Sequence, residues 1–153
     1  MIDENVINAI KGYSAIGGNM SYKFPFRKTE SEILKKYLSQ IKKQKKIIAW
    51  RGIGVSEKEW DNLFYKEKIT EKNSIIKNNN KIESFTLDKI RAAGYGSGEI
   101  RVIFEAELNS YLKIKEYSIY PIEDEVLIYN KKFKVISSEY KNGMIWKIKI
   151  KEI

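Results

Sequence analysis

Three groups of polar side chains, far apart in the sequence, combine residue types that bind anions and move protons. Arg51 ends an apolar run, Ser84 opens a short run with two hydroxyls, and Glu123 and Glu125 follow a turn at Pro121. A guanidinium binds phosphate through a planar fork of donors. Two neighbouring carboxylates raise the pKa of one of them, which suits a general base.

The absence of two residue types narrows the chemistry further. The chain contains no Cys and no His. Thiol nucleophiles, disulfide scaffolds and zinc ribbons are therefore excluded, as are His-based triads, His–metal sites and an imidazole base. Catalysis must use carboxylates, hydroxyls, Lys, Arg or Tyr, and no metal site is expected.

The Glu-x-Glu pattern occurs four times, so the pattern alone identifies nothing. The pairs at 30/32 and 57/59 lie in polar helical stretches, where we expect them to be solvated. The pair at 105/107 lies on the polar face of a predicted strand, too soon after Ser84 for a turn-bearing loop to intervene. Only Glu123 and Glu125 follow a Pro-containing turn and open an apolar strand. Strand alternation then predicts that both face one side, with Asp124 opposite.

The length and charge of the chain indicate how many domains it forms and what kind of partner it binds. Its 153 residues are enough for one domain, 1–153, and its net charge is +9. A basic balance favours an anionic partner such as nucleic acid. Of the 29 basic residues only four are Arg, which disfavours bidentate recognition of bases or phosphates. Two interpretations stay open: a functional basic face, or lysines that only solvate the surface.

The hydropathy pattern bears on location. No stretch approaches the ~18 apolar residues of a membrane span. The acidic start of the chain lacks the apolar core of a signal peptide. We therefore expect a cytoplasmic protein without a membrane span, or one delivered into a target cell by other machinery.

The order of predicted elements indicates an α+β fold. Helices are expected at 4–11, ending at Gly12, and from Thr29 as N-cap to 41, closed by the lysine-rich run 42–46. A short strand at 47–51, a helix at 56–65, a surface loop at 77–81 and a helical turn at 88–95 follow. Strands are expected at 82–86, 99–108, 112–119, 126–129, 133–137 and 144–150, the last after a hairpin turn at Asn142-Gly143. Helices first and strands later favour a mostly antiparallel sheet.

The three polar groups in this order resemble the mono-ADP-ribosyltransferase family of the Arg/Ser/Glu-x-Glu type, which includes bacterial toxin and phage effector domains. The resemblance covers roughly residues 6–150, and the lead-in with Ile10, Tyr13, Asn19 and Arg27 is also similar. It implies a single catalytic domain in which N-terminal helices pack on a mostly antiparallel split β-sheet sandwich.

The resemblance also implies a substrate and a set of roles. NAD would be the substrate, and nicotinamide the leaving group. Glu125 would stabilise the positive charge that develops on the ribose, and Glu123 would orient and deprotonate the acceptor. The implied NAD-binding residues are Arg51, Gly52, Ser84, Phe85, Thr86 and Tyr95.

The resemblance implies a role for each of these residues, and the sequence departs from the family pattern at one place. Arg51 would hold phosphate, and Ser84 would fix Glu125 or the ribose. Ser84-Phe85-Thr86 departs from the commoner Ser-Thr-Ser. The rings of Phe85, Tyr95 or Tyr120 are candidates for stacking on a ring of the substrate.

By the same resemblance, the first glutamate of the pair, Glu123, implies arginine as the acceptor. The leading hypothesis is a protein–arginine mono-ADP-ribosyltransferase, acting as a toxin or effector and hydrolysing NAD as a side activity. ADP-ribosylation of nucleic acid is the alternative that the charge of +9 keeps open. A non-catalytic basic binding module on the same fold is a third. The expected partners are NAD and a protein with an exposed arginine, and an antitoxin or immunity protein stays an open possibility.

Overall fold

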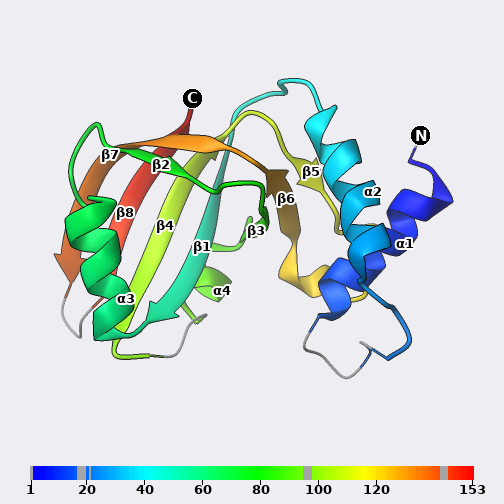
Figure 1. Ribbon diagram of the computed structural model, residues 1–153, viewed down its shortest axis with the longest axis horizontal. Helices are drawn as coiled ribbons and strands as arrows, with labels where there is room; N and C mark the ends of the chain where they lie inside the picture. Colours follow the sequence, from blue (N-terminus) through cyan, green and yellow to red (C-terminus); the bar gives the residue numbers. More distant parts are fainter. Residues whose placement is uncertain (1, 17–19, 21, 95–97, 142–144) are drawn as a thin grey trace.

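The computed structural model describes residues 2–16, 20, 22–94, 98–141 and 145–153. Two helices open the chain, and eight strands with short helical turns between them follow (Figure 1). The elements are α1 (Glu4–Ala15), α2 (Lys28–Ser39), β1 (Ile47–Val55), α3 (Glu57–Asp61), the π-helical turn η1 (Asn62–Lys66), β2 (Ile75–Lys77), β3 (Ile82–Thr86), α4 (Lys89–Ala93), β4 (Ile100–Leu108), β5 (Leu112–Lys113), the 3-10 turn η2 (Pro121–Glu123), β6 (Glu125–Tyr129), β7 (Lys132–Lys141) and β8 (Ile145–Glu152). No helix in these described stretches is long and apolar enough to cross a bilayer.

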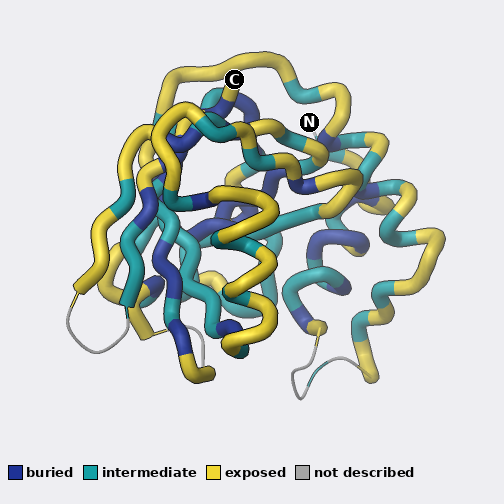
Figure 2. The backbone as a smooth tube through the Cα atoms, turned by 60° about the vertical axis from the view of Figure 1, so that its left-hand side comes forward, coloured by how far each residue is buried: buried dark blue, intermediate teal, exposed yellow. Residues whose placement is uncertain are grey.

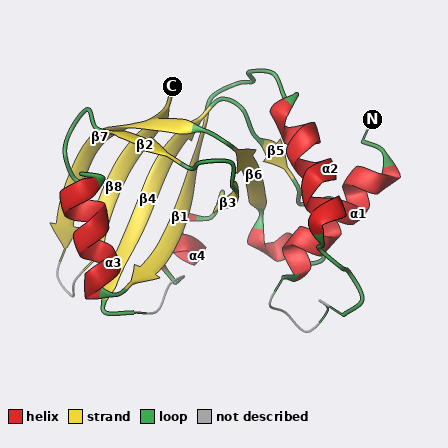
Figure 3. Cartoon of the chain, in the orientation of Figure 1, coloured by secondary structure: helices red, strands yellow, loops and turns green. Residues whose placement is uncertain are grey.

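The strands form one sheet that is nearly divided in two. Their order is β2-β7-β8-β4-β1-β3-β6-β5, and every pairing is antiparallel except β4 with β8. β1 pairs with β4 along its whole length but with β3 only at Trp50 and Thr86. The sheet therefore splits beside Trp50, with α1 and α2 on the β5–β6 part and α3 on the larger part (Figure 3). This confirms the predicted α+β fold with a mostly antiparallel split sheet.

Strand β6 lies between two hydrophobic cores. Val126 and Ile128 belong to the core of the larger part of the sheet, and Leu127 belongs to the core beneath α1 and α2. All three are at most 1% exposed, and Figure 2 shows the buried segments running through the middle of the molecule. A strand buried on both faces is an unbroken apolar run, which explains why 126–129 was recognisable from the sequence. It also anchors Glu125, the first residue of β6.

The two N-terminal helices differ from their predicted bounds. α1 continues through Gly12 to Ala15, so Gly12 is not a stop signal. A Cβ at Gly12 would lie 2.3 Å from the carbonyl oxygen of Pro25, so this glycine serves close packing of the following segment. The N-cap of α2 is Arg27 without a side-chain hydrogen bond, so the prediction of Thr29 as N-cap was wrong. α2 ends at Ser39, so the lysine run 42–46 does not close a helix.

Two predicted strands also have different lengths. β1 extends to Val55, so Arg51 lies in the middle of a strand rather than at its end. The strand expected at 112–119 is only two residues long, because the chain turns after β5: the N–H groups of Tyr117 and Ser118 donate to the carbonyl of Ile114. The predicted hairpin turn at Asn142-Gly143 lies outside the described residues, and the flanking strands β7 and β8 pair antiparallel.

Candidate active site

The two glutamates lie on either side of a sharp backbone turn. Glu123 ends the 3-10 turn η2, Asp124 has left-handed dihedral angles (φ 45°, ψ 58°), and Glu125 begins β6. A hydrogen bond joins the Glu123 and Glu125 side chains. The prediction that both face one side holds, but its reason was wrong: a left-handed residue, rather than strand alternation, brings them together. Asp is among the few residue types that tolerate this conformation.

Thr86 fixes this turn from the end of β3. Its side chain is 2% exposed, and its hydroxyl donates to the carbonyl of Glu123 at 2.8 Å and accepts from the N–H of Asp88 at 3.0 Å. The N–H of Leu87 donates to the carbonyl of Asp124 at 3.0 Å. Because these hydrogen bonds use the donor of the Thr86 hydroxyl and one of its two lone pairs, Thr86 positions the turn that carries the glutamates. Its assignment as a substrate-binding residue stays a prediction.

Arg51 reaches β3 from the middle of β1. Its Nη1 donates to the carbonyl of Ser84 at 2.9 Å, and its Nε lies 3.4 Å from Oε2 of Glu83. The Arg51 side chain keeps 33% of its surface exposed. A guanidinium has five N–H donors, so these two contacts orient the fork and leave donors for an anionic ligand. Glu83 had no role in the sequence-based prediction.

Ser84 lies at the centre of the polar cluster. Its side chain is hydrogen-bonded both to Glu125 and to the phenol of Tyr13, which comes from α1. Burial raises the pKa of Tyr13 above its ordinary value, so the phenol stays neutral and keeps its proton for hydrogen bonding. Tyr13 was noted in the sequence only as part of the N-terminal lead-in, and the packing of α1 against β3 brings it into the site.

The environment of Glu125 favours the neutral carboxyl. Burial, the hydrogen bond with Glu123 and the charge of Glu123 together raise the pKa of Glu125 from 4.5 to about 8, against smaller opposing effects of Ser84 and Arg51. Two carboxyls this close share a proton, so the raised pKa belongs to the pair. Near neutral pH the pair therefore holds a proton that a positively charged ligand would displace.

Two cavities meet at this cluster. One of about 210 Å³ is bordered by Trp50, Arg51, Gly52, Ser84, Phe85, Thr86, Glu123 and Glu125. The other, of about 440 Å³, is bordered by Tyr13, Ser14, Ile16, Ser84, Tyr120, Glu123 and Glu125. They share Ser84 and the two glutamates. The structure thus brings together every predicted site residue except Tyr95, which lies outside the described residues.

Phe85 borders the smaller cavity but does not offer its ring. Its side chain is 3% exposed and packs in the core, with its ring centroid 6.3 Å from that of Phe133. The prediction that Phe85 is a candidate for stacking is therefore corrected. Besides Phe85, the described aromatic residues that border the cavities are Tyr13, Trp50 and Tyr120, and of these three only Tyr120 was a predicted candidate for stacking.

The other Glu-x-Glu pairs lie elsewhere. Glu105 accepts from Nε1 of Trp50 at 3.2 Å and lies 3.6 Å from Nζ of Lys149, while Glu107 pairs with Lys46. Glu59 forms a capping box with Ser56 at the start of α3. No group of three acidic side chains that could hold a metal ion occurs within the described part of the chain.

Comparison with known proteins connects this arrangement to a fold. No protein family and no curated protein matches the sequence. Solved structures do: exoenzyme S from Pseudomonas aeruginosa, in a complex with human 14-3-3 protein beta and bound to Carba-NAD, has a TM-score of 0.74 at 13% identity over 98% of this chain and 74% of that chain. C3stau2 from S. aureus with NAD has a TM-score of 0.65 at 16% identity over 99% and 88%. The ADP-ribosyltransferase Vis in complex with agmatine has a TM-score of 0.62 at 18% identity over 98% and 69%.

These solved structures share little sequence identity with this chain but have a similar architecture. They establish that the chain has the mono-ADP-ribosyltransferase fold. The fold implied by the order of Arg51, Ser84 and Glu123/Glu125 is thereby confirmed.

Proposed function

We propose that this chain, which has the mono-ADP-ribosyltransferase fold, cleaves NAD, releases nicotinamide and transfers ADP-ribose to an arginine side chain of a protein. The observation that carries the proposal is the hydrogen-bonded pair Glu123–Glu125, held against Ser84 and Arg51 at the junction of two cavities. Further support comes from solved structures of the same fold that contain NAD or Carba-NAD. Residues 1–153 would form one catalytic domain that acts as a toxin or effector.

The site suits NAD as the substrate that is consumed. Taken together, the two adjoining cavities of about 440 and 210 Å³ are of the size that small-molecule sites usually have, roughly 300–1,000 Å³. Arg51 has donors left for the pyrophosphate, since only two contacts within the protein orient its fork. Ser84 would hold Glu125 beside the ribose, and the rings of Tyr13 and Tyr120 border the larger cavity.

Glu125 would act on the bond between ribose and nicotinamide. Cleavage of this bond leaves positive charge on the ribose, which an adjacent carboxylate stabilises. Glu125 must be ionised to do so, although burial and Glu123 raise its pKa to about 8. The positive charge of the nicotinamide ring would shift this equilibrium toward the carboxylate, with Arg51 and Ser84 acting in the same direction. The charged form would thus be available when substrate is bound.

Glu123 would receive a proton from the acceptor. An arginine guanidinium keeps its proton in water, since its pKa exceeds ~12, so it needs a base close by to become a nucleophile. Glu123 borders both cavities, and its hydrogen-bond partner is Glu125, whose pKa is raised. Vis, which shares the fold, was solved with agmatine, an arginine analogue. This supports arginine as the acceptor here.

A transfer assay tests the proposal. Wild-type protein is incubated with NAD labelled in the adenylate moiety, together with agmatine, a whole-cell lysate or purified RNA. We expect release of nicotinamide and label on agmatine and on lysate proteins. Label on RNA with agmatine unmodified would replace arginine by nucleic acid as the acceptor. The absence of nicotinamide release under all conditions would instead indicate a binding module without catalysis.

A further inference from the structure

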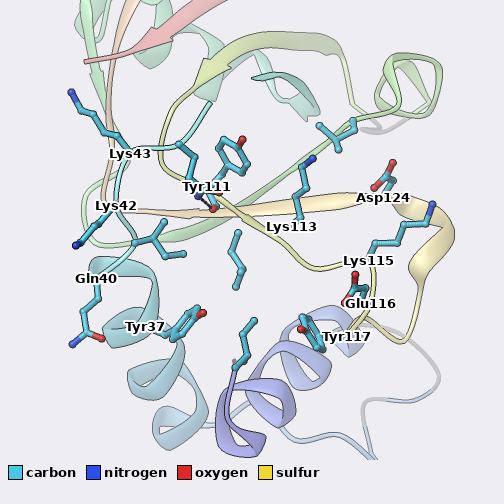
Figure 4. A pocket seen from close by; sticks show the side chains of 15 residues that line it. Tyr37, Gln40, Lys42, Lys43, Tyr111, Lys113, Lys115, Glu116, Tyr117 and Asp124 are labelled. Atoms are coloured by element: carbon cyan, nitrogen blue, oxygen red, sulfur yellow. Dashed lines mark hydrogen bonds between the residues drawn. The ribbon is translucent and has the colours of Figure 1, made fainter. Parts of the chain in front are cut away.

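A large groove lies apart from the candidate active site. It has a volume of about 940 Å³ and lies between α2, the connection from α2 to β1, and the β5 edge of the sheet (Figure 4). Of the residues described, none borders both this groove and either cavity of the active site. A molecule bound in the groove would therefore not compete directly with NAD.

The rim of the groove is basic. Lys42 and Lys43 lie on one side of it, and Lys113 and Lys115 come from the β5 side (Figure 4). Within the described ranges, none of these four ammonium groups forms an ion pair. The lining includes only two acidic residues, Glu116 and Asp124, so the groove presents unpaired positive charge.

The lysine-bearing segment is held in a defined position. The N–H of Gln44 donates to the carbonyl of Asn109 at 2.7 Å, and its Nε2 donates to the carbonyl of Tyr111 at 2.6 Å. The phenol of Tyr111 donates to the carbonyl of Lys45 at 2.7 Å. These bonds fix residues 44 and 45 against the turn between β4 and β5. Lys42 and Lys43 directly precede these two fixed residues, so they lie on an ordered side of the groove and not at the end of a helix.

The floor of the groove is apolar. It includes Ile2, Ile41, Leu87 and Leu112, each half-buried. Tyr111 is only 6% exposed and its hydroxyl is bonded, so it offers no ring face to a ligand. The half-buried rings of Tyr37 and Tyr117 also line the groove, and tyrosine is common where proteins bind one another. No arginine lines it for bidentate contact with phosphate. The combination fits carboxylates beside apolar side chains better than a nucleic acid strand.

We propose that this groove binds an acidic segment of a partner protein that carries apolar side chains on one face. The apolar face would cover the floor, and the carboxylates would meet the four lysines at the rim. The net charge of +9 would speed the encounter with such a partner at low salt. The groove also reaches the turn that carries the two glutamates. Asp124, the residue between them, lines the groove, as does Leu87, whose N–H donates to the carbonyl of Asp124.

Direct binding tests this inference independently of catalysis. The probe is a fluorescent peptide with Glu and Leu at helical spacing, and two comparison probes carry Ser in place of Leu or Lys in place of Glu. We expect the Glu/Leu peptide to bind at least ~10-fold more tightly than either, with an affinity that falls as salt rises. Binding should be unchanged in Glu125→Gln protein, so a failure of the proposed enzymatic function would leave this result intact.

Matched charge reversals locate the site. Reversal of all four groove lysines to Glu should weaken binding of the Glu/Leu peptide at least ~10-fold. Reversal of the exposed Lys58, Lys66, Lys72 and Lys77, which lie outside the groove, changes the net charge equally and should have a much smaller effect. Circular dichroism checks that both variants are folded. Equal losses in the two variants, or tighter binding of single-stranded RNA than of the peptide, would overturn the proposal.

Discussion

The carboxyl groups of Glu123 and Glu125 are hydrogen-bonded to each other across a single residue, Asp124, whose dihedral angles are left-handed. This contact couples the two proposed roles. After burial, it is the next cause of the raised pKa of Glu125, and its other partner, Glu123, is the group that would accept a proton from arginine. The turn that creates the contact is itself fixed from β3, through the hydroxyl of Thr86. Protonation and geometry at this turn are therefore the properties that experiments can address.

The first prediction concerns pH. Because Glu125 must be ionised and its pKa is raised to about 8, kcat/KM for NAD should rise with pH between about pH 6 and about pH 9. Glu123→Gln removes the neighbouring charge, so the residual activity should reach its plateau at lower pH. Nicotinamide release in constant-ionic-strength buffers measures both profiles. A flat wild-type profile, or a shift to higher pH in the variant, would contradict the raised pKa.

Glu123→Ala should separate the two halves of the reaction. Without the base, arginine modification should be lost, while slow hydrolysis of NAD by water should persist through Glu125. Parallel assays of nicotinamide release and of agmatine labelling make the comparison. If both activities fall equally, the two glutamates act as one unit and the division of roles is wrong.

Thr86→Val should affect the catalytic step more than binding. The change leaves the part-buried N–H of Asp88 and carbonyl of Glu123 without the Thr86 hydroxyl, at a cost to stability of roughly 1 kcal/mol. We expect kcat to fall with little change in the KM for NAD, because the turn that carries the glutamates loosens. Thr86→Ser keeps the hydroxyl and should restore most activity. A rise in KM alone would instead indicate that Thr86 contacts NAD.

Gly12→Ala should destabilise the fold although alanine favours helices. The new Cβ would lie 2.3 Å from the carbonyl oxygen of Pro25, and the shift needed to relieve the clash costs about 1–3 kcal/mol. Gly94→Ala is the matched control, because a Cβ at Gly94 would lie 3.4 Å from its nearest neighbour, the carbonyl oxygen of Arg91. Thermal unfolding of the two variants measures the difference. Equal stability of the variants would show that Gly12 does not serve close packing.

Local patterns in the sequence were sufficient for part of the fold. The strand at 82–86 and the apolar run from Val126 were predicted, because β6 is buried on both faces and its pattern needs no knowledge of distant residues. The order of Arg51, Ser84 and the two glutamates was enough to indicate the fold. Whether these residues bind and cleave NAD stays a prediction.

Long-range contacts account for what the sequence did not reveal. Tyr13 joins the site only because α1 packs beside β3, and Glu83 gains its role from Arg51 across the sheet. The lysine run looked like a helix end because its anchors, Asn109 and Tyr111, lie more than 60 residues away. The left-handed Asp124 had no signal either, since a Glu-Asp-Glu sequence at the start of an apolar run is equally compatible with simple strand alternation.

Nicotinamide release by Glu125→Gln protein tests the proposed chemistry most directly. The substitution keeps the size and hydrogen-bonding capacity of the side chain and removes the charge that would face the ribose. With circular dichroism and thermal unfolding showing an intact fold, we expect NAD cleavage and transfer to agmatine to fall by about 10²–10³-fold or more. If the variant instead retains most of the wild-type rate of nicotinamide release, Glu125 is not the group that stabilises the transition state, and the proposed active site is wrong.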